Sequence, residues 1–121
     1  MDASDIALNL IRIPRALGTG GRSLHDLLKE AGYYERHDLI AASDIREALL
    51  TDPECIDKWI SYSEDKRASA GWYITQGGFG FTVGYFSSGT GTSGETTFTD
   101  RIAACAAFIK KEIEDVRADA G

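Results

Sequence analysis

The chain has 121 residues, of which 43% are hydrophobic and 26% are charged, so its composition is that of an ordinary globular protein. This length suits one domain, 1–121, that buries a core of its own. The formal net charge of -6 and the scattered basic residues exclude a typical nucleic-acid-binding protein, which needs clustered Lys and Arg. No signal-peptide pattern and no membrane-length apolar run are found, so we expect a cytoplasmic protein without membrane contact.

Residues 6–13 carry the first apolar pattern, which fits two kinds of structure. The spacing of Ile6, Leu10 and Ile13 is helical, whereas alternating apolar residues in the same segment also fit a strand. Pro14 would kink or split a helix at this point, because it removes a backbone donor. The sequence therefore leaves helix and strand open here.

Two helices are predicted in the next part of the chain. Ser23 is a good N-cap for the first of them, and Gly32 is a natural stop at its end. The polar and aromatic stretch YYERHD that follows is interpreted as a connector. The second helix is expected to begin near Ser43 or Asp44. With Asp44 as its N-cap, Glu47 three residues later makes an imperfect capping box.

Two further helices are predicted, one before and one after a β-rich region. The first begins at TDPE, with Asp52 as N-cap and Pro53 as first helical residue, and extends to about Lys66. The other is the longest in the chain and covers residues 98–118. Its core-facing stripe consists of Ile102, Ala106, Ile109, Ile113 and Val116.

The sequence GWYITQGGFGFTVGYF predicts a β-hairpin over residues 71–86. Gly77 and Gly78 suit the positive φ angles of a two-residue turn. This turn would pair Gln76 with Phe79, Ile74 with Phe81 and Trp72 with Val83. These six side chains would share the face that packs on the helices.

The opposite face of the hairpin carries Tyr73 among glycines. Its ring is predicted to cover Gly80 and Gly84, as aromatic residues do where they support glycines in sheets. Because two strands are marginally stable alone, we expect either a third strand, from residues 95–98 or from part of 6–13, or close cover of the hairpin by helices.

Residues 87–96, which are rich in Gly, Ser and Thr, are predicted to be a flexible loop. They contain the pattern G-x-G-x-x-G at Gly89, Gly91 and Gly94, which is typical of dinucleotide-binding loops. Such a loop opens directly into a helix and needs an acidic residue on a following strand. Here the helix is expected to begin after the motif, and Glu114 would lie on the helix itself. We therefore expect no cofactor at this loop.

Histidine and cysteine give little sign of chemistry. His25 and His37 have no metal-ligand spacing with each other or with a cysteine. Cys55 and Cys105 lie among apolar residues of predicted helices, where free cysteine is usually a small buried hydrophobic residue. Burial makes a thiol a poor nucleophile. We therefore expect no metal site, no catalytic residue and no disulfide.

The most unusual chemistry lies at the end of the helix before the hairpin. The candidate interaction or anion site consists of Asp65, Lys66, Arg67, Ser69, Trp72 and Tyr73. Cations in the last turn of a helix also have a purely structural role, because they oppose the helix dipole. Trp, Tyr and Arg are common at protein interfaces, and a guanidinium can hold a carboxylate or phosphate. Protein binding and anion binding both stay open.

The string SEDKRASAGWY, at Ser63–Tyr73, resembles a segment of a family of small uncharacterised bacterial proteins. Small acidic bacterial proteins include toxin-neutralising immunity proteins. The resemblance therefore implies an immunity-type or regulatory protein as one hypothesis.

Together the patterns predict an α+β fold. About four helices, including a long C-terminal one, would pack against a small antiparallel sheet built on the hairpin. The leading hypothesis is a non-enzymatic module that binds another protein. The alternative is a small-molecule or anion-binding protein, with or without catalytic activity, with a site near Lys66, Arg67 and Tyr73. A homodimer through the sheet edge or through the face of small residues is the third hypothesis.

Overall fold

The computed structural model describes residues 2–17, 23–65, 70–78, 80–87, 89 and 91–120 of the chain. The elements in chain order are α1 (Ala3–Ile11), α2 (Ile13–Leu17), α3 (Leu24–Glu30), α4 (Tyr33–Arg36), the 3-10 helix η1 (His37–Leu39), α5 (Ala42–Thr51), α6 (Glu54–Asp65), β1 (Ala70–Gly77), β2 (Gly80–Ser87), β3 (Gly91–Phe98) and α7 (Arg101–Ala120). The strands form one antiparallel sheet in the order β1-β2-β3. The predicted α+β fold with a long C-terminal helix is confirmed.

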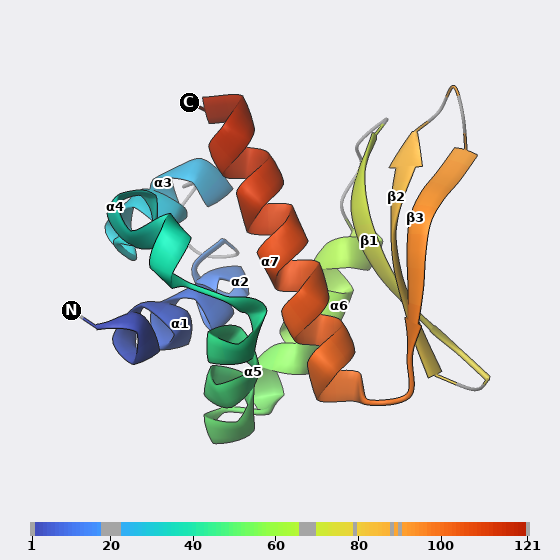
Figure 1. Ribbon diagram of the computed structural model, residues 1–121, viewed down its shortest axis with the longest axis horizontal. Coiled ribbons are helices and arrows are strands. Elements are labelled where there is room, and N and C mark those ends of the chain that lie inside the picture. The colour runs from blue at the N-terminus through green and yellow to red at the C-terminus, as the bar shows by residue number, and fades with distance from the viewer. Residues whose placement is uncertain are drawn as a thin grey trace.

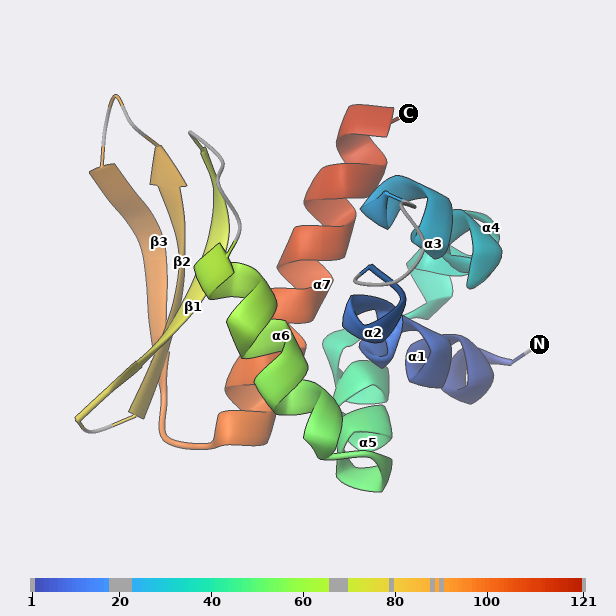
Figure 2. The same ribbon diagram turned by 180° about the vertical axis from the view of Figure 1, so that it is seen from behind.

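All helices lie on one side of the sheet (Figure 1). Helices α6 and α7 contact β1, and α7 also contacts β2. The remaining helices pack on the far side of α7, so α7 separates the helical layer from the sheet. In the reverse view, the other face of the sheet again points away from every helix (Figure 2).

The first apolar segment, residues 6–13, is helical and is split at Arg12. Helix α1 ends at Ile11, and α2 begins at Ile13. Pro14 occupies the second position of α2, where a backbone N–H has no acceptor inside the helix. The proline therefore divides the segment without breaking either helix, as the sequence predicts.

The starts of α3 and α5 differ in how well the sequence predicts them. Ser23 Oγ accepts the Asp26 N–H at 3.1 Å, and the Asp26 carboxylate accepts the Ser23 N–H at 3.3 Å, so the expected cap is confirmed. Helix α5 begins at Ala42, and the prediction of Asp44 as its N-cap is wrong. The Asp44 carboxylate instead reaches back to the Ala41 N–H at 2.8 Å from inside the first turn.

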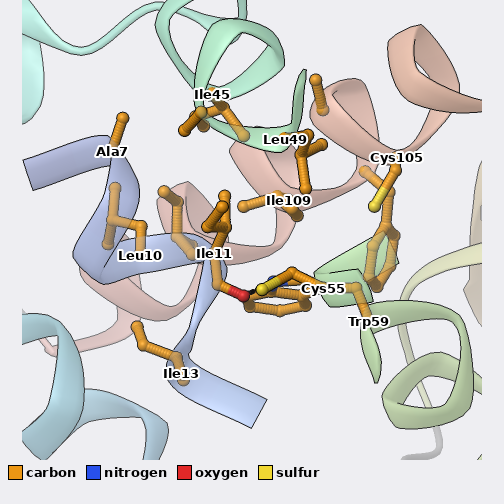
Figure 3. Packing of buried hydrophobic residues seen from close by; sticks show 14 of the residues in the cluster. Ala7, Leu10, Ile11, Ile13, Ile45, Leu49, Cys55, Trp59, Cys105 and Ile109 are labelled. Atoms are coloured by element: carbon orange, nitrogen blue, oxygen red, sulfur yellow. Dashed lines mark hydrogen bonds between the residues drawn. The ribbon is translucent and has the colours of Figure 1, made fainter. Parts of the chain in front are cut away.

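One cluster of buried hydrophobic residues joins the helices to the sheet, to which Ile74, Phe81 and Val83 belong. Figure 3 shows part of the cluster where helices meet. Trp59 of α6 is fully buried in it, and its indole N–H donates to the Ile11 carbonyl at 3.0 Å. This bond satisfies a carbonyl that the end of α1 leaves without an intrahelical partner. The Phe108 ring meets the Trp59 ring edge to face, with 6.2 Å between centroids. The contact fastens α1, α6 and α7 together.

Helix α7 is buried on two sides. The predicted stripe from Ile102 to Val116 faces the core, and Ile109 and Ile113 in it are fully buried. Cys105 and Phe108 are also fully buried, on a side that the stripe does not include. A helix between two layers must bury more than one face, which explains the wider apolar surface.

The hairpin of β1 and β2 forms in a register different from the predicted one. The observed pairs include Gln76 with Phe81, Ile74 with Val83 and Trp72 with Tyr85, and Gly77 pairs with Gly80. Each residue of β1 thus pairs two residues further along β2 than predicted, which leaves every side chain on its expected face. The observed register packs the Trp72 ring against Tyr85 and sets Tyr73 opposite Gly84, two contacts that the predicted register lacks.

Residues 91–96 belong to β3, so the prediction of a loop over 87–96 is wrong for most of its length. Two residues of β3, Gly94 and Glu95, lie opposite Gly84 and form a β-bulge. Gly94 has a φ of 61°, the left-handed conformation that this kind of bulge requires. The glycines of the G-x-G-x-x-G pattern therefore include one that starts a strand and one that bends it.

Candidate functional site

The six residues of the predicted site do not form one described surface. Lys66, Arg67 and Ser69 lie outside the described residues, and Asp65 ends α6. Trp72 and Tyr73 are neighbours on β1 and therefore point to opposite faces of the sheet. The two aromatic residues of the predicted site therefore lie on different surfaces, Trp72 on the face toward the helices and Tyr73 on the opposite face.

Trp72 faces the helices and packs beneath α7. Its ring meets the Tyr85 ring edge to face at 5.4 Å, and Lys111 Nζ lies 4.6 Å from its centroid. A cation at this distance is attracted to the electron-rich face of an indole. These contacts hold the sheet against the C-terminal half of α7.

A buried carboxylate links the two helices that cover the sheet. Glu112 of α7 is 3% exposed, and the Tyr62 hydroxyl of α6 donates to its Oε2 at 2.6 Å. Burial, and then the charge of Glu112, raise the pKa of Tyr62, so the hydroxyl keeps its proton and remains a donor. This hydrogen bond positions α6 relative to α7.

The face of the sheet away from the helices is called here the outer sheet face. It consists of Tyr73, Thr75, Thr82, Phe86, Thr92, Glu95 and Thr97, together with Gly71 and Gly84. Thr75, Thr82 and Thr97 stand directly opposite one another in a row across all three strands. Phe86 is 42% exposed. The face is therefore rich in hydroxyl groups and carries an exposed aromatic side chain at Phe86.

Tyr73 and Glu95 cover Gly84 in the middle of this face. A Cβ on Gly84 would lie 2.6 Å from the Tyr73 hydroxyl oxygen and 2.9 Å from Glu95 Cγ, so a larger residue would displace these side chains. The predicted cover by Tyr73 is confirmed for Gly84, whereas Gly80 is approached by the Phe98 carbonyl instead. The bulge at Gly94 brings Glu95 to this position.

Two hydroxyl groups hold the Glu95 carboxylate. Thr92 Oγ1 donates to Glu95 Oε1 at 2.9 Å, and the Tyr73 hydroxyl is hydrogen-bonded to the same side chain. Burial, and then the charge of Glu95, raise the pKa of Tyr73, which keeps the hydroxyl protonated as a donor. Glu95 is exposed, so the carboxylate is fixed in position while facing solvent.

The two edges of the sheet differ. At the β1 edge, Ser63 Oγ accepts the Ile74 N–H at 3.0 Å and donates to the Ile74 carbonyl at 3.4 Å. A single side chain of α6 thus satisfies both backbone groups of Ile74 that face away from β2. At the β3 edge, residues 91–97 are exposed, and only Phe98 packs against the core.

A second polar cluster joins α4 to α7 on the helical side. Lys110 Nζ donates to the Tyr33 hydroxyl at 2.9 Å and to Glu114 Oε1 at 3.1 Å. Arg117 Nε donates to Glu114 Oε2 at 2.5 Å. Burial acts to raise the pKa of Glu114, but hydrogen bonds from its neighbours, Arg117 first, outweigh burial and lower it. The charges in this cluster are satisfied within it.

The sequence contains only part of the signal for this cluster. The spacing of Lys110 and Glu114 indicates a helical ion pair, which the structure confirms. The stretch YYERHD, interpreted as a connector, instead forms α4 and most of η1. Tyr33 is fully buried there, and its pKa is raised by burial and then by Glu114. The burial of Tyr33 against α7 could not be predicted from the sequence, because the contact forms only in the tertiary structure.

Both cysteines are buried and free, as predicted. Burial raises the pKa of the Cys105 thiol to about 12 and raises that of Cys55 as well. Thiols with raised pKa values are poor nucleophiles at neutral pH. The two cysteines therefore act as core residues (Figure 3).

Within the described residues, no three His, Cys, Asp or Glu side chains converge on a point where a metal ion could bind. None of the helices in these ranges has the length and apolar character needed to span a membrane. Comparisons with protein-family models, curated proteins and solved structures find no match to this chain.

Proposed function

We propose that this chain is a non-enzymatic module that binds another protein through its outer sheet face, as an immunity-type or regulatory protein. One observation carries the proposal: the three strands contain a single charged residue, Glu95, although 26% of the chain is charged. Half of the strand residues face the helices, but the outer sheet face is exposed to solvent. Ordinary surfaces mix charges of both signs, whereas charged residues are depleted in the centre of protein interfaces.

The chemistry of the outer sheet face supports the same function. Tyrosine supplies a large contact area with few rotatable bonds, and hydroxyl groups adapt their hydrogen bonds to a partner. Tyr73 is already fixed over Gly84, and Thr75, Thr82 and Thr97 form a row beside it. A surface fixed before binding loses little conformational entropy on association.

Affinity capture with a matched pair of variants tests the proposal. Phe86 and Leu50 are similarly exposed apolar residues, at 42% and 47%, but Phe86 lies on β2 and Leu50 lies on α5. The tagged wild-type chain is expected to retain a stoichiometric partner from the cells that produce it naturally. Phe86→Asp should lose this partner, and Leu50→Asp should keep it. Loss with Leu50→Asp alone, or no stoichiometric partner at all, would contradict the proposal.

A further inference from the structure

The hydrogen bonds at the β1 edge determine which backbone N–H and carbonyl groups of β3 point away from the sheet. Ile74 turns its N–H and carbonyl toward Ser63, so its partner Val83 turns these groups toward β3. Val83 pairs with Thr96, and the groups of the next residue, Thr97, therefore point away from the sheet. On the other side of the bulge, the alternation along β2 turns the backbone groups of Phe86 toward β1, so those of its partner Thr92 point outward. The β3 edge thus presents donors and acceptors to an incoming strand.

The β3 edge lacks most of the usual protection against pairing. Natural edge strands carry Lys, Pro or an inward-pointing charge, or another element covers them. Strand β3 has the sequence GTSGETTF, without Lys or Pro, whereas Ser63 and α6 cover the β1 edge. The bulge at Gly94 bends β3 and confines regular pairing to its second half, residues 95–98.

The charge of the chain favours one kind of added strand at this edge over another. The one charge on the strands, Glu95, lies where this second half begins and is already held by Thr92 and Tyr73. A second copy of the chain would bring a net charge of -6 against -6 and a second Glu95 to the same edge. A cationic side chain on a neighbouring strand would instead pair with the fixed carboxylate.

We propose that β3 receives an extended segment of a partner protein as a fourth strand, and that Glu95 binds a Lys or Arg of this segment. The inference rests on the proposed function and specifies how the partner binds. Backbone hydrogen bonds to Thr97 supply sequence-independent affinity, and Glu95 supplies selectivity for a basic residue. The acidic chain as a whole would also accelerate the encounter with a basic segment.

A random-peptide display library tests this mode of binding with a defined probe. Selection against the wild-type chain is expected to yield peptides with alternating β-branched residues and a Lys or Arg at one fixed position. Thr97→Pro removes the outward N–H without touching the β2 ladder, and Thr97→Val is its control, because valine keeps the N–H. Binding of the selected peptide should fall at least tenfold in Thr97→Pro and clearly less in Thr97→Val, which keeps the N–H and loses only a side-chain hydroxyl of the outer sheet face.

Two further measurements identify the contacts. Glu95→Gln should weaken the peptide on the order of tenfold and remove most of the salt dependence of binding, because the charge-assisted bond is lost. In the wild-type complex, the Thr97 amide should become protected from hydrogen exchange. Circular dichroism of each variant verifies that the fold is kept.

The outcomes separate this inference from the proposed function. Selected peptides without a basic residue, equal binding to Thr97→Pro, or a library without binders would overturn the inference. If the captured cellular partner still depends on Phe86 in that case, the proposed function stands without it. If the partner also fails to depend on Phe86, both fall.

Discussion

The helical layer and the sheet use charge in opposite ways. Ion pairs connect the helices to one another, and they include Arg12 with Asp52, Arg15 with Glu54, and Arg101 with Asp57. The three strands contain a single charged residue, Glu95, and its carboxylate is held by neutral hydroxyl groups. Exposed ion pairs contribute little stability, so their main effect is to keep the helical surface hydrated. The outer sheet face carries one charge instead of such pairs, and low charge is typical of the centre of a protein interface, which supports the proposed binding role.

Stability should come mainly from the helical layer, and Trp59 gives the largest test. Trp59→Ala removes a fully buried side chain and its hydrogen bond to Ile11, so about 3–5 kcal/mol of unfolding free energy should be lost. Urea denaturation measures the loss. Trp59→Phe keeps part of the packing and should cost less. A loss below about 1 kcal/mol in Trp59→Ala would show that the core is centred elsewhere.

An effect of intermediate size on stability is expected at the β1 edge of the sheet. Ser63→Ala leaves the N–H and carbonyl of Ile74 without their partner, which should cost about 1–3 kcal/mol. It should also open the β1 edge, so that self-association appears in sedimentation experiments. Ser61→Ala on the exposed side of α6 is the matched control and should change neither property. Equal stabilities of the two variants would contradict the role given to Ser63.

The smallest expected effect lies in the polar cluster of α4 and α7. The pKa of Glu114 is lowered in the folded chain, so its contribution is complete above the ordinary pKa of glutamate and is lost as the pH falls through the folded value. Glu114→Gln should cost about 0.5–1 kcal/mol at neutral pH and show a weaker decline in acid. Denaturation at several pH values measures both. A parallel decline in wild type and variant would exclude this linkage.

The sequence predicts local structure better than pairing between strands. The Ser23 cap, the split at Pro14 and the stripe of α7 follow from neighbouring residues, and the structure confirms them. The register of the hairpin was predicted wrongly, because several adjacent positions fit the sequence preferences of a tight turn. The contact of Tyr73 with Gly84, between residues on different strands, distinguishes the observed register.

Strand β3 and the outer sheet face show why the candidate site was harder to predict. Residues 91–96 resemble a loop because glycines and small hydroxyl residues replace the usual apolar alternation. A strand exposed on both faces has no apolar side to reveal it. The covering of Ile74 by Ser63 depends on two elements that meet only after folding. The scarcity of charge across the three strands, which contain Glu95 alone, is visible in the sequence and is the signal that could have indicated the surface.

Site-specific photocrosslinking tests the central claim most directly. A photoreactive phenylalanine analogue is placed either at Thr82, in the middle of the outer sheet face, or at Leu50 on α5. The analogue at position 82 is expected to form one saturable crosslink to the captured partner, and the analogue at position 50 is expected to form none. A crosslink from position 50 with none from position 82 would contradict the assignment of the outer sheet face as the binding surface.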